Sequence, residues 1–115
     1  MAISFEAIGG QYVTFAAAAD AAKDAVCKIT ANGTVGACDD GDAFCGVCEE
    51  LRGGAAAVQM GGYAELRYSG DTAPALGYAA LAADGTGGVK AATSGGRSCL
   101  VVRVDSTGKT VGVFL

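Results

Sequence analysis

The chain has 115 residues, a length that fits one domain, and residues 1–115 are expected to form a single folded unit. Its formal net charge is −4, and its eight Lys and Arg residues are scattered singly along the chain. Nucleic-acid binders need clustered positive charge, and a bilayer-crossing helix needs an apolar run of roughly 20 residues. The sequence has neither feature, so we expect no nucleic-acid partner and no membrane partner.

The N-terminal residues and the cysteines indicate where the protein works. Residues 1–6 have no basic segment and include an acid at Glu6, so they do not resemble a secretory signal. We therefore expect a soluble protein made in the cytosol, in which residues 1–10 could form an extended N-terminal arm. The five cysteines are expected to be reduced thiols, since a cytosolic setting and an odd count both disfavour a disulfide framework.

The hydrophobic fraction of the chain is 51%, but alanine supplies much of it. Alanine buries little surface, and burial of apolar surface stabilises a fold by about 25 cal/mol per Å². The sequence thus predicts a thin core for the chain length. Burial between subunits would compensate for it, so we expect a homo-oligomer.

The first third of the chain combines a helix-prone segment with a hairpin signal. Residues 16–25 are rich in alanine, the best helix former, so one short helix is an option there. Asn32-Gly33 then separates two apolar runs, residues 25–30 and 34–38, and predicts a hairpin with a type I′ turn. A polar turn at residues 39–42 leads into the next expected strand, residues 44–48.

The middle of the chain continues this rhythm. Residues 63–68 alternate between apolar and polar side chains, which predicts a strand with Ala64, Leu66 and Tyr68 on one face. Residues 71–74 then resemble a helix cap followed by an early proline. By local rules alone, a helix at residues 75–83 is as well supported as a strand. Because a glycine at position 77 disfavours a helix, we interpret this segment as a loop leading into a strand.

The C-terminal third gives the clearest strand signals. Residues 99–104 and 110–115 are valine-rich and flank a glycine-containing loop, which predicts a hairpin. Short strands at intervals of about ten residues, with glycine turns between them, are typical of small barrels and sandwiches. The predicted fold class is all-β: one small barrel or sandwich of short strands.

The chain contains no histidine, which removes the usual general base and the commonest metal ligand. We accordingly assign no catalytic, cofactor-binding or metal-binding residue, expect no cofactor, and expect no enzyme. Asp39-Asp40-Gly41-Asp42 lacks the ligand spacing of a calcium loop and is best explained as a solvated turn, and Glu49-Glu50 as an exposed strand end. The glycine pairs fit none of the phosphate-binding patterns, and four tyrosines without tryptophan offer only a weak carbohydrate surface.

Cys45-Gly46-Val47-Cys48 is the motif with the most chemical content. In a redox site the first cysteine opens a helix, whereas this motif lies in a β-like run, where residues three apart point to opposite faces. A structural zinc site would recruit Cys27 and Cys38 as the two further thiolates. The simplest interpretation is that these cysteines are small apolar fillers of β positions, with zinc binding and thiol redox chemistry as alternatives.

The order of these signals resembles the small decoration, or cement, proteins that coat the capsids of tailed bacteriophages and prophages. The resemblance spans most of the chain from Gly9 onward, and the following segments carry it: Tyr12–Phe15, Asn32-Gly33, Gly46-Val47, Gly62-Tyr63, Ser69–Thr72, Asp84-Gly85 and Thr110–Val113. It rests on rhythm and composition, and two features depart from it: the number of cysteines and the long alanine run at residues 16–22.

The resemblance implies a function without catalysis. It implies a virion protein that binds the outer face of an assembled shell, with the major capsid protein as its partner and a trimer as its oligomeric state. A cysteine-based zinc domain and, after it, a thiol redox protein remain the alternative functions.

Overall fold

The computed structural model describes residues 10–115, so the optional arm at residues 1–10 lies, except for Gly10, outside the described part. Residues 10–115 contain ten β-strands and no helix, which confirms the all-β prediction. The strands are β1 (Gln11–Ala17), β2 (Val26–Ala31), β3 (Thr34–Ala37), β4 (Gly46–Arg52), β5 (Ala55–Gly61), β6 (Tyr63–Arg67), β7 (Gly77–Ala83), β8 (Val89–Ala91), β9 (Arg97–Asp105) and β10 (Thr110–Phe114).

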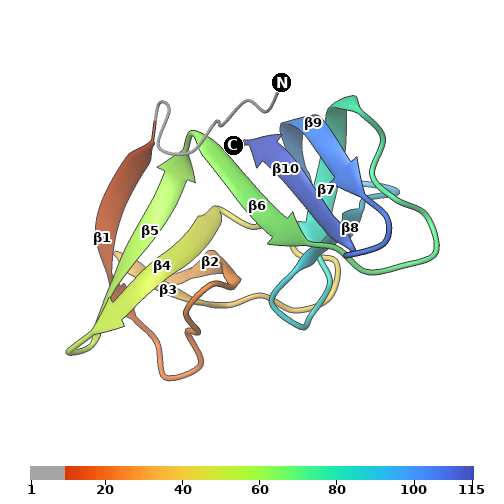
Figure 1. The fold of residues 1–115 in the computed structure, drawn as a ribbon. Coiled ribbons are helices and arrows are strands. Elements are labelled where there is room, and N and C mark those ends of the chain that lie inside the picture. Colours follow the sequence, from red (N-terminus) through yellow and green to blue (C-terminus); the bar gives the residue numbers. More distant parts are fainter. Residues whose placement is uncertain (1–9) are drawn as a thin grey trace.

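The first five strands, which we call the first half, form a closed barrel in the order β1-β3-β2-β4-β5 (Figure 1). Strand β1 closes it by pairing in parallel with β3 and antiparallel with β5. The last five strands, the second half, form a sheet in the order β6-β10-β9-β7-β8. Just past β6, Tyr68 makes a parallel bridge to Val89 in β8, which brings the two edges of this sheet together.

The two halves share one topology. In each half the first strand pairs in parallel with the third and antiparallel with the fifth, and the fourth strand lies between the second and the fifth. Strand β6 therefore corresponds to β1, β7 to β2, β8 to β3, β9 to β4, and β10 to β5. The two halves are therefore structural repeats of one five-stranded arrangement.

The strand registers support this structural repeat. The consecutive β1–β5 pairs, which run from Tyr12↔Gln59 to Ala16↔Ala55, have a matching ladder in the β6–β10 pairs, from Tyr63↔Phe114 to Arg67↔Thr110. A β-bulge also recurs at the same place. In the first half it lies between Cys48 and Glu50 where β4 faces β5, and in the second half between Val101 and Arg103 where β9 faces β10. Because a bulge re-aims the strand that carries it, both halves bend alike.

Each half has its own core of small side chains. The first-half core is built around Cys27, Val35, Cys48, Ala56 and Val58, and the second-half core around residues that include Leu81, Val101 and Val113. The largest fully buried side chains of the described part are one leucine, seven valines and three cysteines. Small interior side chains let the strands close into narrow barrels.

The halves are joined by more than the short connection at Gly62. The β3–β4 connection (residues 38–45) runs from the first half to the second, where Gly41 and Asp42 exchange backbone hydrogen bonds with Ala83 (2.8 Å each) (Figure 1). Phe44, on the same connection, is buried in the second-half core. Arg97 of β9 donates hydrogen bonds to the carbonyl oxygen atoms of Cys45 (2.8 Å) and Met60 (3.1 Å).

The expected strands are found with shifted ends, and two details differ from the sequence analysis. The alanine-rich residues 16–25 continue β1 to Ala17 and then turn, so the short helix considered for this segment does not form. Asn32-Gly33 does join β2 to β3, but only Gly33 adopts a positive φ (60°), so the predicted type I′ turn is wrong. A bulge between Ile29 and Ala31 absorbs the difference in register.

Other local predictions are confirmed. Ala64, Leu66 and Tyr68 share the buried face of β6, while Glu65 and Arg67 point outward. Residues 75–83 are a loop followed by a strand that begins at Gly77, where φ is 92°. Two strands were not predicted: β5, whose run of alanines carries no β signal, and β8, which has only three residues.

Candidate functional site

A row of apolar side chains crosses the outer surface of the second half. Tyr78 lies opposite Leu100, Leu100 opposite Phe114, and Phe114 opposite Tyr63. Directly opposed residues in antiparallel strands share one face of the sheet. Their neighbours in sequence, such as Ala64, Ala79, Cys99 and Val113, pack in the core, so the row faces away from it. We call these four residues the outer row of the second half.

The exposed end of this row is strongly apolar. Tyr78 is 81% exposed, and Leu76, two residues before it, is 69% exposed. At the other end, the rings of Tyr63 and Phe114 contact each other edge to face, with their centroids 5.5 Å apart. An exposed apolar surface of this kind is typical of a contact site.

A charged pair borders the row. Arg103 donates a hydrogen bond to the Glu65 carboxylate (2.6 Å), and hydrogen bonding with Tyr63 and then with Glu65 raises the pKa of Arg103. Both partners are exposed. Apolar residues bordered by a solvated ion pair have the composition of a protein–protein contact, in which a polar rim surrounds an apolar centre.

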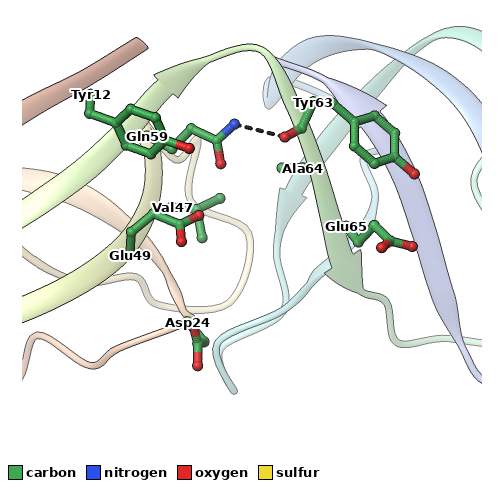
Figure 2. Close-up of a pocket in the computed structure, with 8 residues that line it drawn as sticks. All are labelled: Tyr12, Asp24, Val47, Glu49, Gln59, Tyr63, Ala64 and Glu65. Carbon is green, nitrogen blue, oxygen red and sulfur yellow. Dashed lines mark hydrogen bonds between the residues drawn. The ribbon is translucent and has the colours of Figure 1, made fainter. Parts of the chain in front are cut away.

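A cleft of about 380 Å³ lies where the two halves meet (Figure 2). It is lined by Tyr12, Asp24, Val47, Glu49, Gln59, Tyr63, Ala64 and Glu65. The Gln59 amide nitrogen donates hydrogen bonds to the carbonyl oxygen atoms of Gly61 (3.1 Å) and Tyr63 (2.8 Å) and so fixes the connection between the halves. The carboxylates come from separate elements and do not meet at one point in Figure 2.

The predicted zinc ligands do not come together as a set. Cys27 and Cys48 belong to the first-half core and Cys45 packs against it, whereas Cys38 packs against the second-half core. All five cysteines of the chain are free thiols. Among residues 10–115, no group of three or more acidic, histidine or cysteine side chains is arranged to hold a metal ion.

The structure pairs Cys45 with Cys27, which lies far from it in sequence, and leaves Cys48 apart. Cys45 precedes β4, and its backbone amide donates a hydrogen bond to the Cys27 carbonyl oxygen (2.8 Å). The two thiols also hydrogen-bond each other, and this contact lowers the pKa of Cys45, with Arg97 adding to the effect. The same contact and burial raise the pKa of Cys27, and burial raises the pKa of Cys48. Cys45 is therefore the most acidic thiol of the group.

The aspartates of the polar turn form ion pairs with two strands. Lys28 of β2 lies 2.6 Å from Asp42 and 3.4 Å from Asp39, and Lys90 of β8 lies 2.7 Å from Asp40. The hydrogen bond from Lys28 lowers the pKa of Asp42. These contacts hold the β3–β4 connection between the two halves. Glu49 and Glu50 lie inside β4 at its bulge, so the expectation that they form a strand end is wrong.

Comparison with models of known protein families and with curated protein sequences finds no match. Within the described range, no helix has the length and apolarity needed to cross a bilayer. Of the four tyrosines, Tyr68 is buried, while Tyr12 and Tyr78 are exposed on different halves.

Proposed function

We propose that the chain is a decoration protein of a tailed-bacteriophage or prophage capsid. On this proposal it is made in the bacterial cytoplasm, acts on the virion surface, and binds the major capsid protein together with further copies of itself as a trimer. The observation that carries the proposal is the exposed apolar surface at Leu76 and Tyr78, which the half-buried rest of the outer row continues. A small all-β chain with such a surface is suited to contact between proteins.

The physical effect of such a protein follows from mass action. A partner that binds only the assembled shell stabilises that shell against dissociation. Each 100 Å² of apolar surface buried in the contact contributes about 2.5 kcal/mol before the costs of association. Many copies on one shell would add their contributions. The turn spacing that resembles known decoration proteins supports the same function.

The test is binding to shells assembled from the major capsid protein encoded in the same phage or prophage genome. Purified chain is mixed with these shells and sedimented through a density gradient. We expect it to travel with the shells, to saturate at a fixed number of copies per capsid subunit, and to raise the temperature at which the shells fall apart. An unrelated acidic protein of similar size is the control. Absence of binding, or binding that never saturates, contradicts the proposal.

A further inference from the structure

Two cysteines that are far apart in sequence meet where β2 pairs with the start of β4. In this antiparallel ladder Cys27 lies opposite Gly46. The amide of the preceding residue, Cys45, donates its hydrogen bond to the Cys27 carbonyl oxygen (2.8 Å). Two consecutive residues therefore oppose the single residue Cys27, as they do in a β-bulge. This local geometry places the backbone of Cys45 directly beside that of Cys27.

The side chains of this pair lie in the same part of the first-half core. Cys27 belongs to that core, and the half-buried Cys45 packs against it. Their thiols hydrogen-bond each other. A disulfide needs two Cα atoms about 5.5 Å apart with the side chains directed toward each other, and residues opposed through hydrogen bonds in an antiparallel ladder have this spacing. The pair is therefore placed to form a disulfide without rearrangement of the strands.

Cys45 is the member of the pair that a reagent in solution can reach. It is half-buried, whereas Cys27 is buried. Arg97 donates a hydrogen bond to the Cys45 carbonyl oxygen (2.8 Å), which places a positive charge near the thiol. The hydrogen bond with the Cys27 thiol and the charge of Arg97 lower the pKa of Cys45 to about 7. A large share of Cys45 is therefore thiolate at neutral pH, and the thiolate is the form that attacks a disulfide.

The other three cysteines are less suited to react with Cys45. The Cys48 thiol is buried and donates a hydrogen bond to the carbonyl oxygen of Glu50 on its own strand (3.7 Å). Cys99 is buried in the second-half core, and Cys38 packs against that same core. The cysteine of β2 is thus the thiol that Cys45 contacts.

We propose that Cys45 is a site of oxidation by small disulfides, with Cys27 as the second thiol that converts it into an intramolecular disulfide. The Cys45 thiolate attacks one sulfur of oxidised glutathione, the S–S bond breaks, and one glutathione leaves from a mixed disulfide. Cys27 then loses its proton and attacks the Cys45 sulfur, and the second glutathione leaves. Two protein thiols are thereby oxidised to one disulfide, and one small disulfide is reduced to two thiols, which take up the two protons.

The new bond would fix the segment that joins the two halves. Residues 38–45 run from the first half to the second, and Phe44, next to Cys45, is buried in the second-half core. Arg97 of the second half holds the Cys45 carbonyl oxygen. A bond from Cys45 to Cys27 would close a loop that contains the β2–β3 hairpin and this connection. Because a closed loop restricts the unfolded chain, we expect oxidation to stabilise the fold.

The experiment uses the purified full chain alone, so its outcome is independent of the proposed capsid function. The chain is treated with oxidised glutathione, its remaining thiols are blocked with N-ethylmaleimide, and it is digested with trypsin. Cleavage after Lys and Arg places Cys27 in peptide 24–28 and the next three cysteines in peptide 29–52. Mass spectrometry is expected to find these two peptides joined by a bond at Cys45, with no glutathione retained. A bond between Cys45 and Cys48 would instead stay within peptide 29–52.

Three variants assign the roles of the thiols. Cys27→Ala is expected to stop at the mixed disulfide, so glutathione stays on Cys45. Cys45→Ala is expected to acquire no disulfide, and Cys48→Ala, the matched control from the same core, to oxidise like wild type. Oxidation should raise the thermal midpoint of wild type by at least about 5 °C, reversibly with dithiothreitol, and leave that of Cys45→Ala unchanged. Circular dichroism confirms folding, and Cys27→Ser replaces Cys27→Ala if that variant unfolds.

Three results would overturn the proposal. Wild type that keeps all its thiols after treatment would show that Cys45 does not react with a small disulfide. A mixed disulfide that persists on Cys45 in wild type would show that Cys27 does not complete the reaction. A bond within peptide 29–52 that is absent from Cys48→Ala would assign the reaction to Cys45 and Cys48. These readings come from peptide masses and need no folded variant in the first two cases.

Discussion

Cys27 and Cys45 are paired twice, through the backbone hydrogen bond from the Cys45 amide to the Cys27 carbonyl oxygen (2.8 Å) and through their thiols. The contact joins β2 to the residue before β4, and Arg97 lies near enough to favour the Cys45 thiolate electrostatically. A thiol with a lowered pKa reacts as a nucleophile at lower pH than its neighbours, because the thiolate is the reactive form.

The first prediction concerns this difference in reactivity. Cys45 is expected to react with iodoacetamide faster than Cys38 at neutral pH, because burial raises the pKa of Cys38 to about 11. The Cys45 rate should level off at a lower pH than the Cys38 rate. Peptide mass spectrometry after timed labelling measures both sites in one sample. Cys27→Ala removes the thiol contact and should slow Cys45 at neutral pH; equal rates in wild type and variant would contradict the assignment.

A second prediction concerns metal content. Protein purified without chelator is expected to contain no stoichiometric zinc, because Cys38 packs in a different cluster from Cys27, Cys45 and Cys48. Elemental analysis measures the zinc directly, and the thermal midpoint should be the same with and without EDTA. One zinc per chain, lost together with stability on adding the chelator, would restore the metal-binding alternative.

Gly46 gives a third prediction, about packing inside the first barrel. A Cβ at this position would collide with the Gln59 carbonyl oxygen on the neighbouring backbone and lie 2.8 Å from a Val58 methyl group. Gly46→Ala is therefore expected to lower the free energy of unfolding by about 2–3 kcal/mol. Gly53→Ala is the matched control. The φ of +57° at Gly53 is strained for alanine, but a Cβ there would meet no atom within 4 Å. This substitution should lower the free energy of unfolding by only about 1 kcal/mol. Urea unfolding measures both; an equal loss would show that the clash is relieved.

The fourth prediction concerns acid stability at the β7–β8 loop. The Asp84 carboxylate accepts hydrogen bonds from the Ser69 hydroxyl (2.6 Å), the Thr86 amide (2.7 Å) and hydroxyl (2.8 Å), and the Gly88 amide (3.1 Å). Burial raises the pKa of Asp84, but these bonds together lower it below the usual 3.8. Because the folded pKa is below the unfolded one, the stabilisation is complete above pH 3.8 and is lost as the pH falls through the folded value.

Asp84→Asn tests this reasoning. The substitution should lower the free energy of unfolding by about 1–2 kcal/mol at neutral pH, because a charged hydrogen-bond acceptor is lost. It should also make the stability depend less on pH in the acidic range. Asp71→Asn, at an exposed position in the preceding loop, is the control. The urea midpoint of each protein is measured from neutral to acidic pH. An equal fall for wild type and Asp84→Asn would rule out a role of the Asp84 carboxylate in acid stability.

Local patterns predicted most of the strands and little of their arrangement. At residues 63–68 and in the valine-rich runs near the C-terminus, the spacing of the apolar residues shows which side chains are buried. Strand β5 was missed because Ala55–Ala57 has no β-branched side chain, and its place is set by pairing with β1 and β4. Such pairings are tertiary, and the local sequence does not encode them.

The site was less predictable than the fold. The contact of Cys27 with Cys45 depends on the β2–β4 pairing, and the outer row joins residues from four strands that are far apart in sequence. The structural repeat was also hidden, because few corresponding positions hold the same residue. Tyr12 with Tyr63 is a match that spacing alone could have suggested, whereas Cys48 corresponds to Val101 and not to another cysteine.

The duplicated architecture has a consequence for symmetry. If chains associate through the contact that already joins their halves, a closed ring holds twice as many five-stranded halves as polypeptides. Its outline then approximates a rotational symmetry of double the true order, while alternate halves differ in loop length and surface. Such a ring could rest on a binding platform of either order, and the longer β3–β4 connection, present once per chain, would distinguish the true order from the apparent one.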